Sequence, residues 1–174
     1  MTYKVIQTCA TLLEAAAAPR GPHVPEAPVL IGIDPILSPD LLRTLRAMGH
    51  GEEIAIVDAN FPGEGMARRI LRADGHPATD VLRAVLSLMP LDDFVPDPAH
   101  AMEVVGDPDA VPPVLRAFQA IVDEVADAPA PIRRIERFAF YERTRAAHAI
   151  VQTGETRLYG NVILKKGVVR PPAS

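Results

Sequence analysis

The sequence predicts an α/β fold, a single domain in which helices flank a mixed, largely parallel sheet. Short apolar runs alternate with amphipathic helical patterns along most of the chain, as in proteins whose helices pack on a sheet. A chain of 174 residues, 48% of them hydrophobic, is long enough for one such domain and apolar enough for its core. No internal repeat interrupts this alternation.

We expect the domain to begin at Val29, after a segment of different composition. Residues 18–28 contain four prolines, which suits a linker. The apolar residues before this linker are compatible with one short helix, either docked on the domain or mobile. The sequence therefore predicts an extension or linker over residues 1–28 and a domain over residues 29–174.

The first helix of the domain is expected after Ser38, a good N-cap that is followed by Pro39 at the first helical position. One apolar face then recurs at i, i+4 and i+7: Leu41, Leu45 and Met48. Gly49 supplies the stop, and residues 52–59 (EEIAIVDA) read as a short buried strand.

The next two elements are a strand near Ile70, within residues 68–74 (RRILRAD), and a helix. Thr79 or Asp80 is expected to cap this helix, and Pro90 to end it. Its apolar side consists of Val81, Leu82, Val85, Leu86 and Met89. A strand around Val104 follows, in the run AMEVVGD.

A further helix is expected to open at Pro112 and Pro113, where proline is tolerated in the first turn. Its inward face consists of Leu115, Phe118, Val122 and Val125. Residues 131–138 (PIRRIERF) then read as a strand and residues 140–149 as a short helix.

The chain is predicted to end with two strands, over residues 149–155 (AIVQTGE) and 159–167 (YGNVILKKG). Gly154 lies in the turn between them. These two strands could form a hairpin-like pair.

Charge and composition exclude several classes of function. A net charge of −4 and a pI near 5.7 leave no basic surface for nucleic acid or anionic membrane. The one cysteine, Cys9, allows no internal disulfide. No apolar run approaches the roughly 20 residues that span a bilayer, and charged and polar residues make the N-terminus a poor signal peptide. We therefore expect a cytoplasmic protein.

The sequence also lacks the motifs of metal, phosphate and nucleophile chemistry. None of the five histidines is spaced like a zinc ligand pair, and the GHG and GEG runs are too short for a phosphate loop. No serine lies in a G-x-S-x-G elbow. We expect no metal and no cofactor, which leaves cofactor-free proton transfer or plain binding.

Two residues of the stretch MGHGEEIAIVDANFP are candidates for that chemistry. His50 stands between two glycines, where a small substrate can reach an imidazole that gives or takes a proton near neutrality. Asp58 ends a strand, where α/β folds place ligands. Further candidates are polar groups that follow or interrupt apolar stretches: Asp92, Tyr141, Tyr159 and Asn161. Each also has an ordinary explanation, such as an exposed loop or a half-buried tyrosine.

The spacing of His50 and Asp58 raises a difficulty, because a strand separates them. A strand rises roughly 3.3 Å per residue, which places the two side chains towards opposite ends of it. For both to share one pocket, the loop around Gly49 and Gly51 must fold back, or the pocket must join two subunits.

Five segments together resemble the L-fucose mutarotase family, which shares its fold with D-ribose pyranase. They are SPDLLRTLRAMGHGEEIAIVDANFP, RADG, LMPLDDFV, RFAFYERT and AIVQTGETRLYGNVILKKGV. The likeness covers about 140 residues, from near Val29 to Val169, and the last segment is similar to the fucose branch. The resemblance implies a ribose pyranase-like fold and an isomerase that interconverts the α and β anomers of a free sugar without a cofactor.

The resemblance also implies roles for individual residues. His50 matches the proton donor, Asp58 a substrate-binding aspartate and Asp92 a second catalytic carboxylate, although Asp93 beside it leaves that last assignment open. The remaining positions that match sugar-binding residues are Met102, Arg137, Tyr141, Tyr159, Gly160 and Asn161. The family forms homo-oligomers, some of them rings, with sites near subunit contacts.

The leading hypothesis is therefore a cytoplasmic mutarotase for L-fucose or a related monosaccharide. One alternative is a D-ribose pyranase, which converts six-membered into five-membered rings. Another is a sugar-binding oligomer without turnover. Two departures from the family stand out: residues 1–28 have no counterpart, and Asn60 stands where bacterial fucose mutarotases carry a histidine.

Overall fold

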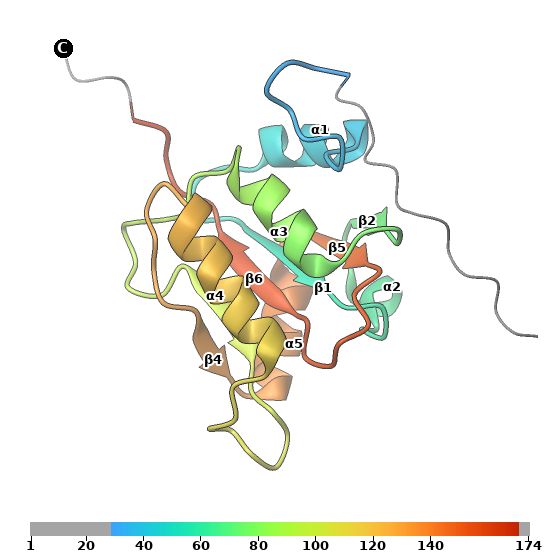
Figure 1. The fold of residues 1–174 in the computed structure, drawn as a ribbon, viewed down its shortest axis with the longest axis vertical. Helices are drawn as coiled ribbons and strands as arrows, with labels where there is room; N and C mark the ends of the chain where they lie inside the picture. The colour runs from blue at the N-terminus through green and yellow to red at the C-terminus, as the bar shows by residue number, and fades with distance from the viewer. Residues whose placement is uncertain (1–28, 171–174) are drawn as a thin grey trace, which may run out of the picture.

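The computed structural model describes residues 29–170 as three layers, with helices on both sides of a six-stranded sheet (Figure 1). The strands are β1 (Glu53–Val57), β2 (Ile70–Ala73), β3 (Ala99–Met102), β4 (Arg133–Ile135), β5 (Ala149–Thr153) and β6 (Val162–Lys165). The helices are α1 (Pro39–Ala47), α2 (Gly63–Met66), α3 (Ala78–Leu86), α4 (Pro113–Val125) and α5 (Arg137–Ala146).

The strand order is β2-β5-β1-β6-β3-β4, which makes β1 and β6 the centre of the sheet. The pairs β1–β5, β2–β5 and β3–β4 are parallel, whereas β6 runs antiparallel to both β1 and β3. The predicted α/β fold with a mixed, largely parallel sheet is thus confirmed.

Strand β1 contributes to a core on both of its faces, because successive side chains point to opposite sides of a strand. Ile54 and Ile56 face the larger core cluster, with α1, α3 and α4. Ala55 and Val57 face a smaller cluster that includes Phe140 of α5. Burial on both faces explains why this strand reads as an unbroken apolar run.

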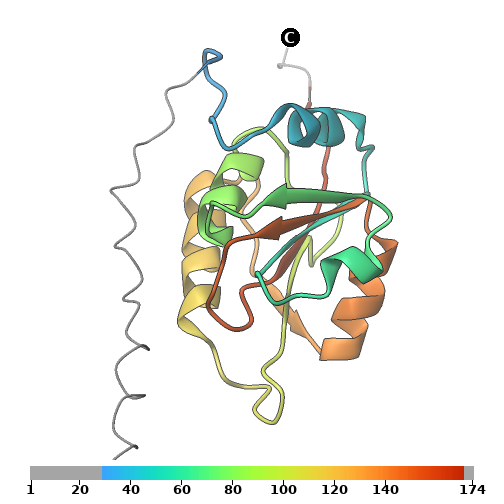
Figure 2. The ribbon, with the colours of Figure 1, turned by 90° about the vertical axis from the view of Figure 1, so that its right-hand side faces the viewer.

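The helices form the two outer layers. Figure 2 shows α3 and α4 on one side of the sheet and α5 with the short α2 on the other, while α1 lies at one end. Helix α1 begins as predicted, since the Ser38 hydroxyl accepts a hydrogen bond from the Leu41 amide at 3.2 Å. Helix α3 begins earlier than predicted, with Pro77 rather than Thr79 or Asp80 at the cap.

The predicted hairpin between the last two strands is wrong, because β1 lies between β5 and β6. Strand β5 pairs with one edge of β1 and β6 with the other. The connecting loop, residues 154–161, therefore passes over the carboxyl end of β1. This crossing brings the loop to Asp58, the residue that follows β1.

Two other strands are displaced from their predicted positions. The strand expected around Val104 is β3, at Ala99–Met102, and Val104 instead forms an isolated bridge with Asp107. The strand expected over residues 131–138 is shortened to β4. The Glu136 carboxylate accepts hydrogen bonds from the Phe138 and Ala139 amides and so starts α5 at the next residue.

The predictions for residues 1–28, including the short helix, lie outside the described residues. Within residues 29–170, no helix is both long and apolar enough to cross a membrane.

Candidate functional site

The loop that carries His50 is fixed at the amino end of β1. The Gly51 amide donates a hydrogen bond to the Lys166 carbonyl at 2.8 Å, and Gly51 has a φ of 80°, which favours glycine. The Asp92 amide donates to the Lys165 carbonyl at 3.1 Å. Both loops are therefore attached to the same end of β6, although they lie far apart in the sequence.

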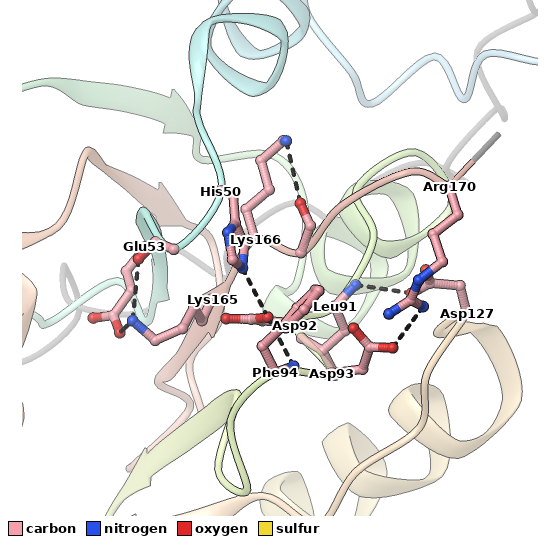
Figure 3. Close-up of polar contacts among 12 residues, drawn as sticks. His50, Glu53, Leu91, Asp92, Asp93, Phe94, Asp127, Lys165, Lys166 and Arg170 are labelled. Atoms are coloured by element: carbon pink, nitrogen blue, oxygen red, sulfur yellow. Dashed lines mark hydrogen bonds and ion pairs between the residues drawn. The ribbon is translucent and has the colours of Figure 1, made fainter.

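This attachment brings an imidazole and a carboxylate together (Figure 3). His50 Nε2 lies 3.1 Å from Asp92 Oδ1, which also accepts a hydrogen bond from the Phe94 amide. The Asp92 side chain is 2% exposed and that of His50 46% exposed. The phenyl ring of Phe94 lies 5.1 Å from the imidazole, centroid to centroid. A buried carboxylate thus orients a histidine whose other side remains open to solvent.

Asp93 has a different position from Asp92. Its carboxylate is more exposed and accepts a hydrogen bond from Arg170 at 2.6 Å. Of the two adjacent aspartates, the structure therefore pairs Asp92 with His50.

A charged cluster lies next to this pair in Figure 3. Glu53, with a side chain 12% exposed, accepts hydrogen bonds from Arg143 and lies 2.8 Å from the Lys165 ammonium. Burial raises the pKa of Glu53, but the hydrogen bonds from Arg143 and Lys165 outweigh it and hold the pKa below its usual range. Glu53 is therefore ionised at neutral pH, and the cluster anchors α5 to the sheet.

Asp58 is held at the other end of β1 by a reciprocal pair with Asn161. The Asp58 amide donates to Asn161 Oδ1 at 2.9 Å, and Asn161 Nδ2 donates to Asp58 Oδ2 at 2.8 Å. The Asn60 amide donates to Asp58 Oδ1 at 2.9 Å, whereas the Asn60 residue is exposed. Gln152 Nε2 donates to the Asp58 carbonyl at 2.6 Å. Both carboxylate oxygens therefore have fixed donors.

The environment of Asp58 makes its carboxyl easier to protonate than that of an ordinary aspartate. Burial raises the pKa of the Asp58 carboxyl, and the negative charge of nearby Glu155 acts in the same direction. Hydrogen bonds from Asn161, Asn60 and Phe61 offset only part of this increase. A carboxylate with a raised pKa is better suited to accept a proton than an ordinary surface aspartate.

The loop over residues 154–161 is closely packed against Asp58. A Cβ on Gly160 would lie 2.5 Å from Glu155 Cγ, so this position requires glycine. Tyr159 adopts a left-handed conformation with φ of 62°, and its hydroxyl accepts a hydrogen bond from the Val105 amide at 3.1 Å. Such a conformation costs a tyrosine roughly 1–2 kcal/mol, and the surrounding contacts maintain it.

The other predicted sugar-binding residues lie, like Asp58, at the carboxyl end of the parallel strands, on the side of the sheet that α5 covers. Met102 ends β3 and belongs to the smaller core cluster, which Tyr141 and Tyr159 contact. Tyr141 packs edge-on against Phe61, with ring centroids 5.4 Å apart. Arg137 is the first residue of α5, and its buried Nε has no hydrogen-bond partner among the described residues.

Within one chain, the candidate site residues thus form two separate groups rather than one pocket. His50 and Asp92 lie at the amino end of β1, attached to the end of β6. Asp58 and Asn161 lie at its carboxyl end, and a strand of five residues spans roughly 16 Å. The loop around Gly49 and Gly51 does not fold back, so the first of the two predicted solutions is wrong within one chain.

Two residues near Asp58 were missed in the sequence. Gln152, in the buried strand β5, donates to the Asp58 and Phe61 carbonyls. Glu155 is 3% exposed and pairs with Arg157. A glutamine inside the otherwise apolar run AIVQT was the available signal, because a buried amide requires partners.

Comparisons with known proteins identify relatives of most of this chain. Residues 31–169 match the model of the RbsD / FucU transport protein family. The fucose mutarotase of Bos taurus is 45% identical over 149 residues, which cover 82% of this chain and 96% of the relative. The L-fucose mutarotase of Actinobacillus pleuropneumoniae serotype 5b (strain L20) is 39% identical over 140 residues, 80% of this chain and 97% of the relative.

Solved structures of related proteins also resemble this chain. The fucose mutarotase of Streptococcus pneumoniae in complex with L-fucose superposes with a TM-score of 0.76 at 42% identity, covering 81% of this chain and all of that chain. Bacillus subtilis RbsD complexed with D-ribose has a TM-score of 0.61 at 22% identity, covering 77% and 95%, and so shares the fold. The family match and these full-length relatives together show that the chain belongs to the RbsD / FucU family.

Proposed function

We propose that this protein is an isomerase that interconverts the α and β anomers of L-fucose. Relatives named fucose mutarotase cover most of the chain, and one related structure contains L-fucose. The observation that carries the proposal is the contact between the half-exposed His50 imidazole and the buried Asp92 carboxylate. An imidazole oriented by a carboxylate is a common device for proton transfer.

The reaction needs proton transfer and little else. A proton must reach the ring oxygen while one leaves the anomeric hydroxyl; the C1–O5 bond then breaks and an open-chain aldehyde forms. After rotation about the C1–C2 bond, the hydroxyl adds to the other face of the carbonyl, and both protons return. Groups that give and take protons are sufficient for each step.

We assign these roles to residues of both groups. His50 delivers the proton to the ring oxygen. Asp92 contacts His50 and acts through it, so it is a positioning residue that stabilises the charged imidazole. Asp58 binds the sugar and takes the proton of the anomeric hydroxyl, which suits its raised pKa. Arg137, whose buried Nε has no hydrogen-bond partner among the described residues, binds a sugar oxygen.

We further propose that one complete site joins two copies of the chain. The two groups lie at opposite ends of β1, so one sugar reaches both only if His50 of one copy faces Asp58 of the next. When such a contact is repeated head-to-tail from copy to copy it is heterologous, and it forms a ring if the rotation between successive copies closes. The proposal therefore includes a homo-oligomer, which we expect to act in the cytoplasm.

The test is exchange NMR on the anomeric protons of the free sugar. One anomer of L-fucose is saturated and transfer to the other is followed with and without the protein, and the measurement is repeated with D-ribose. We expect faster transfer between the fucose anomers and a smaller effect on ribose. Fucose exchange no faster than in buffer would refute the mutarotase, and acceleration confined to ribose would favour a pyranase.

A further inference from the structure

A tight turn between β3 and α4 reaches the predicted sugar-binding edge of the sheet. The Asp107 amide donates to the Val104 carbonyl at 3.1 Å, and Gly106 at the third position has a φ of 84°. Among the described residues Tyr159 is the only non-glycine with positive φ, so φ of Val105 is negative. A negative φ at the second position and a positive φ at the third define a type II turn.

The packing of this turn does not explain its conformation. The Val105 side chain is 57% exposed and belongs to no core cluster. The contact that the turn makes with the site is through the backbone, since the Val105 amide donates to the Tyr159 hydroxyl at 3.1 Å. These two residues are 54 positions apart in the sequence, in separate loops.

We propose that the Val104–Asp107 turn positions the Tyr159 hydroxyl for the sugar through the backbone amide at residue 105, while the exposed Val105 side chain takes no part. A phenol has one O–H donor and two acceptor lone pairs. Because the Val105 amide occupies one lone pair, the O–H proton points elsewhere and can donate to a sugar oxygen. This inference rests on the proposed function.

The surroundings of Tyr159 support a positioning role. Its backbone is held in a rare conformation between the Glu155–Arg157 pair and Gly160, where a Cβ would clash with Glu155. The next residue is Asn161, which is bonded twice to Asp58. The backbone of this segment is therefore already fixed, and the turn additionally constrains the hydroxyl end of the Tyr159 side chain.

The pocket beside this hydrogen bond offers few other partners to the phenol. The two loops line a cavity of about 500 Å³, together with the start of α4. Most of its lining residues are apolar: Val104, Ala110, Val111, Pro112, Pro113, Val114 and Leu158. The remaining lining residues are Tyr159 itself and Arg157, whose guanidinium pairs with Glu155. The hydrogen-bond partner of the phenol is the Val105 amide.

The decisive variant is Val105→Pro. It removes the amide hydrogen and keeps a side chain that suits the second position of a type II turn, where proline is favoured. Val104 forms a bridge and is extended, which is the conformation preferred before proline. Val105→Ala is the matched control, because it shortens an exposed side chain and keeps the amide.

The readout is kcat/KM for fucose anomer exchange, with the melting temperature measured for every variant. We expect Val105→Ala to match the wild type and Val105→Pro to lose roughly tenfold or more, because a small displacement of a positioned group has a large effect on rate. In a Tyr159→Phe background, Val105→Pro is expected to cause no further loss, because the hydroxyl it positions is absent.

Three results would contradict these expectations, and they can be told apart. A wild-type protein without exchange activity overturns the proposed function and this inference with it. An active wild type with an equally active Val105→Pro variant overturns the inference alone. So does the same loss from Val105→Pro in the Tyr159→Phe background, since the effect would then not pass through the hydroxyl.

Discussion

The variant His50→Ala is expected to slow fucose anomer exchange by about 10²–10⁴-fold, the usual contribution of a positioned acid or base. The loss should fall on kcat, because we propose that the sugar is held mainly by the Asp58 group. The fold should be retained, since the His50 side chain is 46% exposed and Asp92 keeps its hydrogen bond from the Phe94 amide. Exchange NMR gives the rate, and sugar titration gives the affinity.

His148→Ala is a well-matched control for this variant. His148 Nδ1 lies 3.1 Å from Glu52, the same distance as between His50 and Asp92, but the Glu52 partner is 45% exposed. We expect this control to retain the wild-type rate, because His148 is not the proposed proton donor and pairs with an exposed carboxylate. Equal rates for His50→Ala and the wild type would disprove the assignment of His50 even if the activity itself is confirmed.

The second large effect is expected for Asp58→Asn, which removes the carboxylate that we propose binds the sugar and takes its proton. We expect exchange to fall at least about 10²-fold and the affinity for sugar to weaken. The wild-type rate should fall as the pH drops through the pKa of Asp58, because the base must be ionised. Since burial raises this pKa, that acid limb should lie above the usual range of an aspartate.

Asp58→Asn also disturbs the fold, so it needs a structural control. The new amide would place a donor against Asn161 Nδ2, which is itself a donor, and an unsatisfied buried polar group costs about 1–3 kcal/mol. The double variant Asp58→Asn with Asn161→Asp reverses donor and acceptor and keeps the three hydrogen bonds around this pair.

The double variant separates stability from chemistry. We expect it to regain the melting temperature of the wild type while remaining slow, because the carboxylate has moved to residue 161. Recovery of both the melting temperature and the rate would show that any carboxylate in this pair is sufficient, which contradicts a specific role for Asp58.

Sequence patterns predicted most of the elements, because the local signals were strong. Ser38 followed by Pro39 marks the start of α1, and the apolar periodicity of α3 and α4 matches their buried faces. The order of strands in the sheet was not predictable in the same way. The insertion of β1 between β5 and β6 depends on long-range pairing, which a turn glycine such as Gly154 does not reveal.

The candidate residues could be selected from the sequence, but their arrangement in the structure could not. A histidine between glycines and an aspartate after a strand are local features, so His50 and Asp58 could be selected directly. The choice of Asp92 over Asp93 could not be made in this way. It depends on the hydrogen bond between the Asp92 amide and the Lys165 carbonyl, which sets the carboxylate that faces His50. The Val105 amide has no side-chain signal and is found only through its contact with Tyr159.

The central claim is that one active site joins the His50 group of one copy to the Asp58 group of another. Its most direct test mixes two nearly inactive proteins, His50→Ala and Asp58→Asn, co-expressed with different tags and purified through both. In mixed rings, about a quarter of the interfaces combine an intact His50 with an intact Asp58. We predict that mixed oligomers regain about a quarter of the wild-type exchange rate, whereas oligomers with no more activity than the two parents would contradict a shared site.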